Sequence, residues 1–110
     1  MTDEIISPLA PEEFPRLHPT HGVKLASFAA GLRYKNRADL MLATFPEGTT
    51  VGGVFTRSLC PSAPVDWCRR IITNGTARAL VCNAGNANAF TGKSGEKVAQ
   101  LTAKEISAIL

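Results

Sequence analysis

The residues of this chain best suited to chemistry lie in segment 83–92, which reads Asn-Ala-Gly-Asn-Ala-Asn-Ala-Phe-Thr-Gly. Its glycines and alanines let a backbone approach a ligand closely, and its asparagines supply uncharged hydrogen-bond donors and acceptors. Thr91 and Gly92 end the segment, just before a long helical pattern. A hydroxyl and a backbone N–H at the start of a helix favour negative charge, because the helix dipole is positive there. The segment is therefore predicted to form a cradle for an anionic group.

A phosphate-binding P-loop is the alternative interpretation of the same residues. The pattern Ala87-x4-Gly92-Lys93-Ser94 matches G-x-x-x-x-G-K-[ST] except that Ala87 replaces the first glycine. Alanine lacks the freedom at positive φ that this first turn uses. No aspartate follows residue 94 to help hold Mg²⁺. Nucleotide binding stays open as an alternative function, and otherwise Lys93 and Ser94 are expected to be exposed residues of a first helical turn.

Metal and thiol chemistry have little support in the sequence. His18 and His21 are too few for a metal site, and no cysteine or carboxylate cluster lies near them. The three cysteines, Cys60, Cys68 and Cys82, fit no C-x-x-C spacing, and no histidine follows Cys82 to activate it. We expect three reduced thiols, no metal and no cofactor.

Size and charge limit the remaining classes. The chain has 110 residues, 45% of them hydrophobic, and a net charge of +3, which suits one small globular domain. Its basic residues, such as Arg33, Lys35 and Arg37, are expected to be solvated surface rather than a nucleic-acid site. No stretch approaches the roughly 18 apolar residues of a membrane span, and the acidic N-terminus lacks a signal-peptide core. We expect a cytoplasmic protein without nucleic-acid or membrane partners.

Hydrophobic patterns predict the elements that position segment 83–92. Residues 1–22 contain four prolines and are expected to be an extended N-terminal segment. Strands are predicted at 23–32, 40–45, 51–56 and 77–82. The 40–45 run is nearly all apolar, so burial on both faces is expected, and the short turn after it favours antiparallel pairing. Gly52-Gly53 indicates a bulge or a close backbone approach.

Helices are predicted at 61–72 and 96–110. Ser62 is placed to cap the first, Pro64 suits its first turn, and Asn74-Gly75 ends it. The second has a mostly apolar stripe formed by Val98, Leu101, Thr102, Ile106 and Ile109. It reaches the last residue without a stop signal, so we expect a fragment of a longer polypeptide that leaves apolar surface exposed. The fold class expected is α/β (α+β), with a mixed, partly antiparallel sheet packed against helices.

Four sequence blocks, in this order and spacing, resemble the N-terminal part of ornithine acetyltransferase, the bifunctional glutamate N-acetyltransferase of arginine biosynthesis. They are Gly53-Val54-Phe55-Thr56, Ala63-Pro64-Val65, Gly75-Thr76-Ala77-Arg78-Ala79-Leu80-Val81, and segment 83–92. The resemblance lies within roughly residues 20–110. It implies an αββα fold like that of ornithine acetyltransferase and DmpA, in which residues 23–110 are the N-terminal part of the first-subunit domain.

The resemblance also implies an activity and a partner. Such enzymes move an acetyl group from N-acetylornithine to glutamate, and use of acetyl-CoA stays open. A precursor cuts itself before a threonine, which becomes the N-terminal nucleophile of a second subunit. A hetero-oligomer of two subunit types is therefore expected. The nucleophile would lie beyond residue 110, outside this sequence.

By the same resemblance, the Thr91 hydroxyl and the Gly92 N–H match the family's oxyanion hole. Acyl transfer develops a negative oxygen, and each donor fixed near it lowers the barrier by roughly 3–4 kcal/mol. The alternative for these residues is a plain helix N-cap at Thr91 with Gly92 in the first turn. Asn83, Asn86 and Asn88 are expected to be scaffolding that satisfies loop backbone groups. A non-catalytic assembly module is the third function considered.

Overall fold

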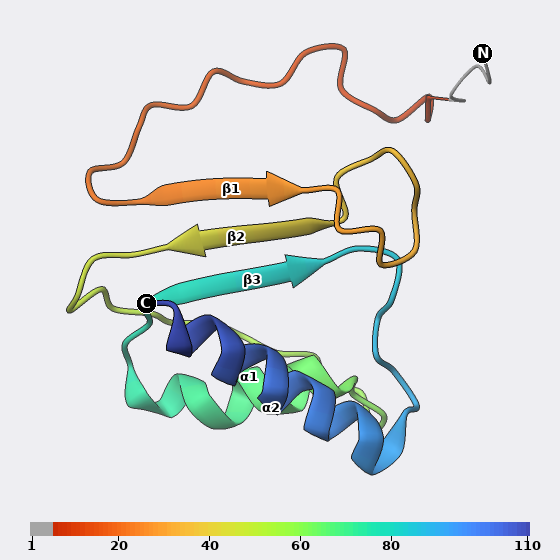
Figure 1. Ribbon diagram of the computed structural model, residues 1–110, viewed down its shortest axis with the longest axis vertical. Helices are drawn as coiled ribbons and strands as arrows, with labels where there is room; N and C mark the ends of the chain where they lie inside the picture. Colours follow the sequence, from red (N-terminus) through yellow and green to blue (C-terminus); the bar gives the residue numbers. More distant parts are fainter. Residues whose placement is uncertain (1–5) are drawn as a thin grey trace.

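The computed structural model describes residues 6–110 as a three-stranded antiparallel sheet with two helices (Figure 1). The strands are β1 (Lys24–Phe28), β2 (Leu40–Thr44) and β3 (Ala79–Asn83), in the order β1-β2-β3. Helix α1 (Ala63–Ile71) continues into the 3₁₀ turn η1 (Ile72–Asn74), and α2 (Gly92–Ala108) ends the chain. Both helices lie on the β3 side of the sheet, and the N-terminal segment lies on the β1 side. The predicted mixed α/β class is confirmed.

Strand β2 forms where the apolar run at 40–45 predicts a strand and is the central one, but four of its five residues are only half-buried, so the predicted burial on both faces is not reached. Leu42 pairs with Ala26 of β1 and with Val81 of β3, so β2 is hydrogen-bonded on both sides. Ala43, in the same strand, is buried. Residues 6–22 form neither helix nor strand, and the first five residues of the predicted extended segment lie outside the described part of the chain. Within residues 6–110, no helix is long and apolar enough to cross a membrane.

The strand predicted at 51–56 is wrong. Only an isolated bridge between Thr50 and Thr76 forms there, and the chain then leaves the sheet toward α1. Arg69 of α1 binds the end of this segment, because its Nη2 donates a hydrogen bond to the Thr56 carbonyl at 2.8 Å. The close approach expected at the glycine pair is found, since a Cβ at Gly53 would lie 2.9 Å from Cδ1 of Ile72. Two adjacent glycines weaken strand formation and here let the chain pass over η1.

The end of the first helical region lies where the sequence predicts it, whereas the predicted side-chain cap of α1 and the predicted start of α2 are not found. Gly75 has φ 71° and ends η1, as Asn74-Gly75 predicted. Ser62 occupies the N-cap of α1, but its side chain makes no capping hydrogen bond. Helix α2 starts at Gly92, earlier than the predicted residue 96. Its first turn has no apolar periodicity, so the pattern missed it.

Small residues, rather than the predicted stripe of large ones, form the most covered face of α2. Gly95 is buried, and the residues one, two and three turns further on are half-buried, namely Ala99, Ala103 and Ile106. Val98, Leu101 and Ile109 of the predicted stripe are exposed. Helix α2 packs against α1, and an ion pair at 3.2 Å joins Arg70 of α1 to Glu96 of α2.

One face of the sheet carries two exposed leucines on its outer strands. Leu25 and Leu80 both pair with Ala43, so all three side chains share a face. Leu25 and Leu80 are nevertheless exposed, at 72% and 48%. The apolar surface that the sequence predicted to remain exposed is therefore found on this face.

A buried carboxylate organises the connection between β1 and β2. Asp39 is 2% exposed, and its two oxygens accept the N–H groups of Ala30 at 2.7 Å and Leu32 at 2.6 Å. Its backbone oxygen accepts the N–H of Ala84 at 2.8 Å, where the segment after β3 begins. Burial works to raise the pKa of Asp39, but hydrogen bonds from backbone N–H groups outweigh it and lower the pKa below the ordinary value of 3.8.

The lowered pKa predicts an acid-sensitive contribution of Asp39 to stability. A folded pKa below the unfolded value means that the stabilisation is present above pH 3.8 and is lost as pH falls through the folded pKa. In Asp39→Asn one carboxylate oxygen is replaced by an NH₂ group, which cannot accept a hydrogen bond from a backbone N–H. The variant should therefore melt at a lower temperature than wild type at pH 7. Melting temperatures at pH 7 and pH 3 test this. The gap between the two proteins should narrow at pH 3, and an equal gap at both pH values would contradict it.

Candidate active site

The asparagine-rich loop, residues 84–91, joins β3 to α2 and carries Thr91 at its end. Its first part is held by the β1–β2 connection, through the Ala84–Asp39 backbone hydrogen bond and through Gly85. A Cβ at Gly85 would lie 2.8 Å from Cβ of Arg33 and from Cε2 of Tyr34. Gly85 also has φ +85°, so both space and backbone conformation favour glycine at this position.

The asparagine side chains satisfy backbone groups of the loop, as predicted for scaffolding. Asn83 Nδ2 donates to the Asn86 carbonyl at 2.9 Å, and Asn86 Oδ1 accepts the Asn88 N–H at 3.2 Å. Asn88 Nδ2 donates to the Gly95 carbonyl in α2 at 2.9 Å. The Asn88 carbonyl accepts the Ala63 N–H at the start of α1, at 3.2 Å. The loop is therefore attached to the beginnings of both helices.

The backbone alternates in hand as it enters α2. Asn88, Phe90 and Gly92 have φ of 49°, 56° and 58°, whereas Thr91 has φ −103° and ψ 0°. Left-handed conformations at two non-glycine residues cost energy, and such strain clusters at functional sites. A right-handed residue followed by a left-handed one points successive N–H groups toward one place, which makes an anion-binding concavity. Within residues 6–110, no acceptor is found for the N–H of Gly92, Lys93 or Ser94.

The Thr91 hydroxyl does not act as a helix cap. Thr91 occupies the N-cap position of α2, but its side chain accepts no N–H of the helix. Its Oγ1 instead donates to Asn88, to Oδ1 at 2.6 Å and at longer range to the backbone carbonyl at 3.3 Å. Thr91 and Phe90 are both exposed, so this end of the loop lies at the surface of the described part of the protein. The capping bond that the plain N-cap alternative requires is not made.

Gly95 is a part of the site that the sequence analysis missed. It is buried in the first turn of α2, and a Cβ there would overlap Oγ1 of Thr91 and lie 2.5 Å from Oδ1 of Asn88. Gly95 follows Thr91 by four residues, so the two share a helix face. That spacing, together with a glycine at an otherwise unfavourable helical position, is the signal that identifies it.

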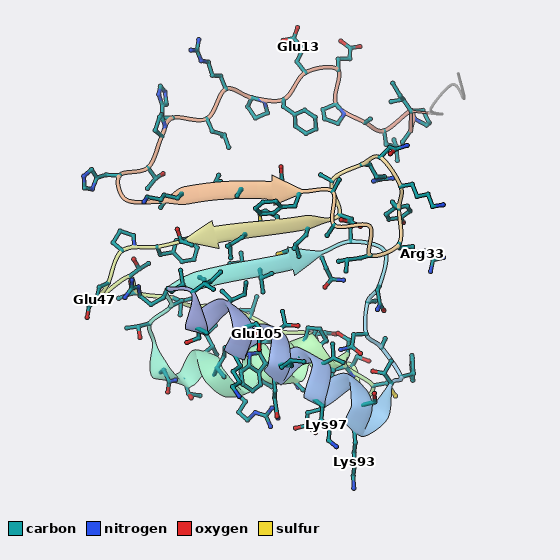
Figure 2. All side chains as sticks on the ribbon, in the orientation of Figure 1. Glu13, Arg33, Glu47, Lys93, Lys97 and Glu105 are labelled. Atoms are coloured by element: carbon teal, nitrogen blue, oxygen red, sulfur yellow. The ribbon has the colours of Figure 1, made fainter. Side chains whose placement is uncertain are left out.

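The P-loop alternative is weakened by the surroundings of Lys93. The sheet is antiparallel throughout, whereas the P-loop belongs to parallel sheets. Lys93 points away from the protein at the start of α2 (Figure 2), and Ser94 is exposed, as expected for first-turn residues. A hollow of about 200 Å³ lies at the other end of the loop, against Ser27, Met41 and Cys82. Neither Thr91 nor Gly92 lines it.

Fold and site together define a class: an antiparallel α/β unit whose long helix begins with a hydroxyl and unpaired N–H groups. The chain belongs to the ArgJ family, whose family model matches residues 24–110. The arginine biosynthesis bifunctional protein ArgJ of Bradyrhizobium diazoefficiens is 59% identical over 99 residues, which are 90% of this chain. The protein of the same name from Brucella suis is 57% identical over 99 residues, also 90% of this chain.

A solved structure supports the same relationship. The crystal structure of ornithine acetyltransferase from Mycobacterium tuberculosis, complexed with ornithine, aligns with a TM-score of 0.72 and 37% sequence identity. The alignment covers 76% of this chain and 44% of that chain. The chain spans about a quarter of the length of the curated relatives it matches, 24% for both ArgJ proteins above. The resemblance found in the four sequence blocks is thereby confirmed at the level of the family.

Proposed function

We propose that this chain is the N-terminal part of an acetyltransferase of arginine biosynthesis, and that Thr91 and Gly92 contribute its oxyanion hole. The observation that carries the proposal is the start of α2, where unpaired N–H groups and a threonine hydroxyl meet in a chain of the ArgJ family. The acetyl donor is N-acetylornithine and the acceptor is glutamate. The name of the relatives places them in arginine biosynthesis, and the structural neighbour was solved with ornithine.

The proposed reaction has two acyl-transfer steps. The N-terminal threonine of a second subunit attacks the acetyl carbonyl of N-acetylornithine, and its own amine takes the hydroxyl proton. The carbonyl oxygen becomes an oxyanion, to which the Gly92 N–H and the Thr91 O–H donate. The C–N bond then breaks, ornithine leaves with the proton, and the acetyl group stays on the threonine as an ester. The glutamate amine attacks this ester through a second oxyanion, and the N-terminal amine of the threonine moves a proton from the glutamate nitrogen to the threonine oxygen as the ester C–O bond breaks. N-acetylglutamate leaves and the threonine hydroxyl is restored.

The exposure of the site suits completion by a second subunit. Thr91 and Gly92 are exposed, and Phe90 beside them is 89% exposed. An oxyanion hole works in a site from which water is excluded, and this part of the protein does not exclude it. A partner surface carrying the nucleophile would cover these residues. We therefore propose a hetero-oligomer of two subunit types, in the cytoplasm.

A chimera tests the proposal directly. This chain replaces the corresponding quarter of the Bradyrhizobium diazoefficiens relative, to which it is 59% identical. We expect the chimera to transfer acetyl from N-acetylornithine to glutamate, and the isolated 110-residue chain to show no turnover above background. Activity of the isolated chain would contradict a nucleophile outside it. A chimera that folds and is processed but stays inactive would contradict the proposed function.

A further inference from the structure

We propose that Asn88 is a positioning residue for the Thr91 hydroxyl. Before reaction the Thr91 O–H donates its hydrogen bond to Oδ1 of Asn88, and it turns to the oxyanion only when negative charge develops there. The inference rests on the proposed function, because it assigns a role to Asn88 within the same oxyanion hole. The other asparagines of the loop make only loop-to-loop hydrogen bonds, whereas the Asn88 side chain contacts Thr91 directly.

The orientation of the Asn88 amide is fixed by its neighbours. Its Nδ2 donates to the Gly95 carbonyl at 2.9 Å, so its Oδ1 must face Oγ1 of Thr91, 2.6 Å away. The side chain is half-buried, and its backbone carbonyl is held by the Ala63 N–H. A flipped amide would set Oδ1 against the Gly95 carbonyl, and two acceptors repel each other. The Thr91 hydroxyl therefore has to direct its single proton at Asn88.

This arrangement makes the hydroxyl selective for the transition state. The carbonyl of a bound amide substrate is an acceptor similar to the Asn88 amide oxygen, so the hydroxyl gains nothing by turning toward it. An oxyanion is charged and accepts a hydrogen bond about twice as strong. The proton therefore turns to the oxyanion when the negative charge forms. An interaction made only in the transition state raises kcat without tightening substrate binding.

Two substitutions separate the steps of this mechanism in the complete enzyme. Asn88→Gly removes both side-chain hydrogen bonds and still suits φ 49°. It should lower kcat about tenfold, with KM unchanged or lower, because Oγ1 then keeps only its longer hydrogen bond, to the Asn88 carbonyl at 3.3 Å. Asn88→Asp keeps the shape but puts a negative charge beside the oxyanion and holds the hydroxyl proton more tightly. It should lower kcat more than Asn88→Gly, by about a hundredfold.

A double-mutant cycle with Thr91→Val tests whether Asn88 affects kcat through the Thr91 hydroxyl. If Asn88 acts through the hydroxyl, Asn88→Gly should change kcat less than about twofold once the hydroxyl is gone. Asn83→Ala is the control, because it loses a loop hydrogen bond to Asn86 without contacting Thr91. It should lower the melting temperature and leave kcat of the folded enzyme unchanged.

The outcomes separate this inference from the function on which it rests. An equal loss of kcat from Asn88→Gly in both backgrounds, or no loss in either, would overturn the role of Asn88. Unchanged kcat in Thr91→Val alone would instead overturn the proposed oxyanion hole. If Asn88→Gly does not fold, Asn88→Ala in the same cycle decides the matter, because it removes the same two side-chain hydrogen bonds without adding a charge. Its loss of kcat should also vanish in the Thr91→Val background.

Discussion

Thr91→Val should lower kcat of the complete enzyme about 10²–10³-fold, with a smaller change in KM. The substitution exchanges the hydroxyl for a methyl group of similar size and leaves the Gly92 N–H in place. The donor acts mainly on charge that develops in the transition state, so its loss appears in kcat. Steady-state kinetics of acetyl transfer from N-acetylornithine to glutamate measure both constants. Thr91→Ser keeps a hydroxyl and should retain much more activity.

The same experiment separates the two alternatives for this segment. If Thr91 were only a helix N-cap, its loss would cost about 1 kcal/mol of stability and leave kcat of the folded protein unchanged. If the segment were a P-loop, Lys93→Ala would abolish binding of magnesium ATP. We expect Lys93→Ala to leave acetyl transfer unchanged, because the Lys93 side chain points into solvent (Figure 2). A Thr91→Val enzyme that melts lower but turns over normally would show that the oxyanion assignment is wrong.

Local signals in the sequence account for much of the fold. The apolar run at 40–45 predicts a strand buried on both faces; the strand forms as β2, but only Ala43 of it is buried. Gly75 ends the first helical region because its left-handed conformation needs glycine. Segment 51–56 has β-branched and aromatic residues but leaves the sheet. Its position is decided by Arg69, more than ten residues away, and no local pattern contains that information.

In the candidate site, too, some features can be predicted from the local sequence and others depend on residues in other elements. Thr91 and Gly92 stand out as candidates because a hydroxyl and a glycine before a helical pattern favour negative charge, whereas their role in an oxyanion hole comes from the family resemblance and stays a prediction. The direction of the Thr91 proton is not, because it depends on the Asn88 amide and on the Gly95 carbonyl in the next element. Asp39 was missed for a similar reason. A single carboxylate after a basic loop looks like surface, and only the folded connection shows that it accepts two backbone N–H groups.

Gly95→Ala should impair both stability and catalysis, although it adds only one methyl group and raises intrinsic helix propensity. The new Cβ would overlap the Thr91 hydroxyl and lie 2.5 Å from Oδ1 of Asn88, so both side chains have to move. Overpacking of this kind costs about 1–3 kcal/mol. A misplaced oxyanion donor costs up to about 10²-fold in rate, so kcat should fall well beyond the loss of folded protein.

Gly52→Ala is the matched control, because nothing lies within 4 Å of a Cβ built at that position. It should change the melting temperature only slightly and leave kcat unchanged. Melting curves and kcat of the two variants, each corrected for the folded fraction, make the comparison. A Gly95→Ala enzyme that is more stable than wild type and fully active would mean that α2 accepts a side chain beside Thr91. The position of the Thr91 O–H would then not depend on its packing against Gly95.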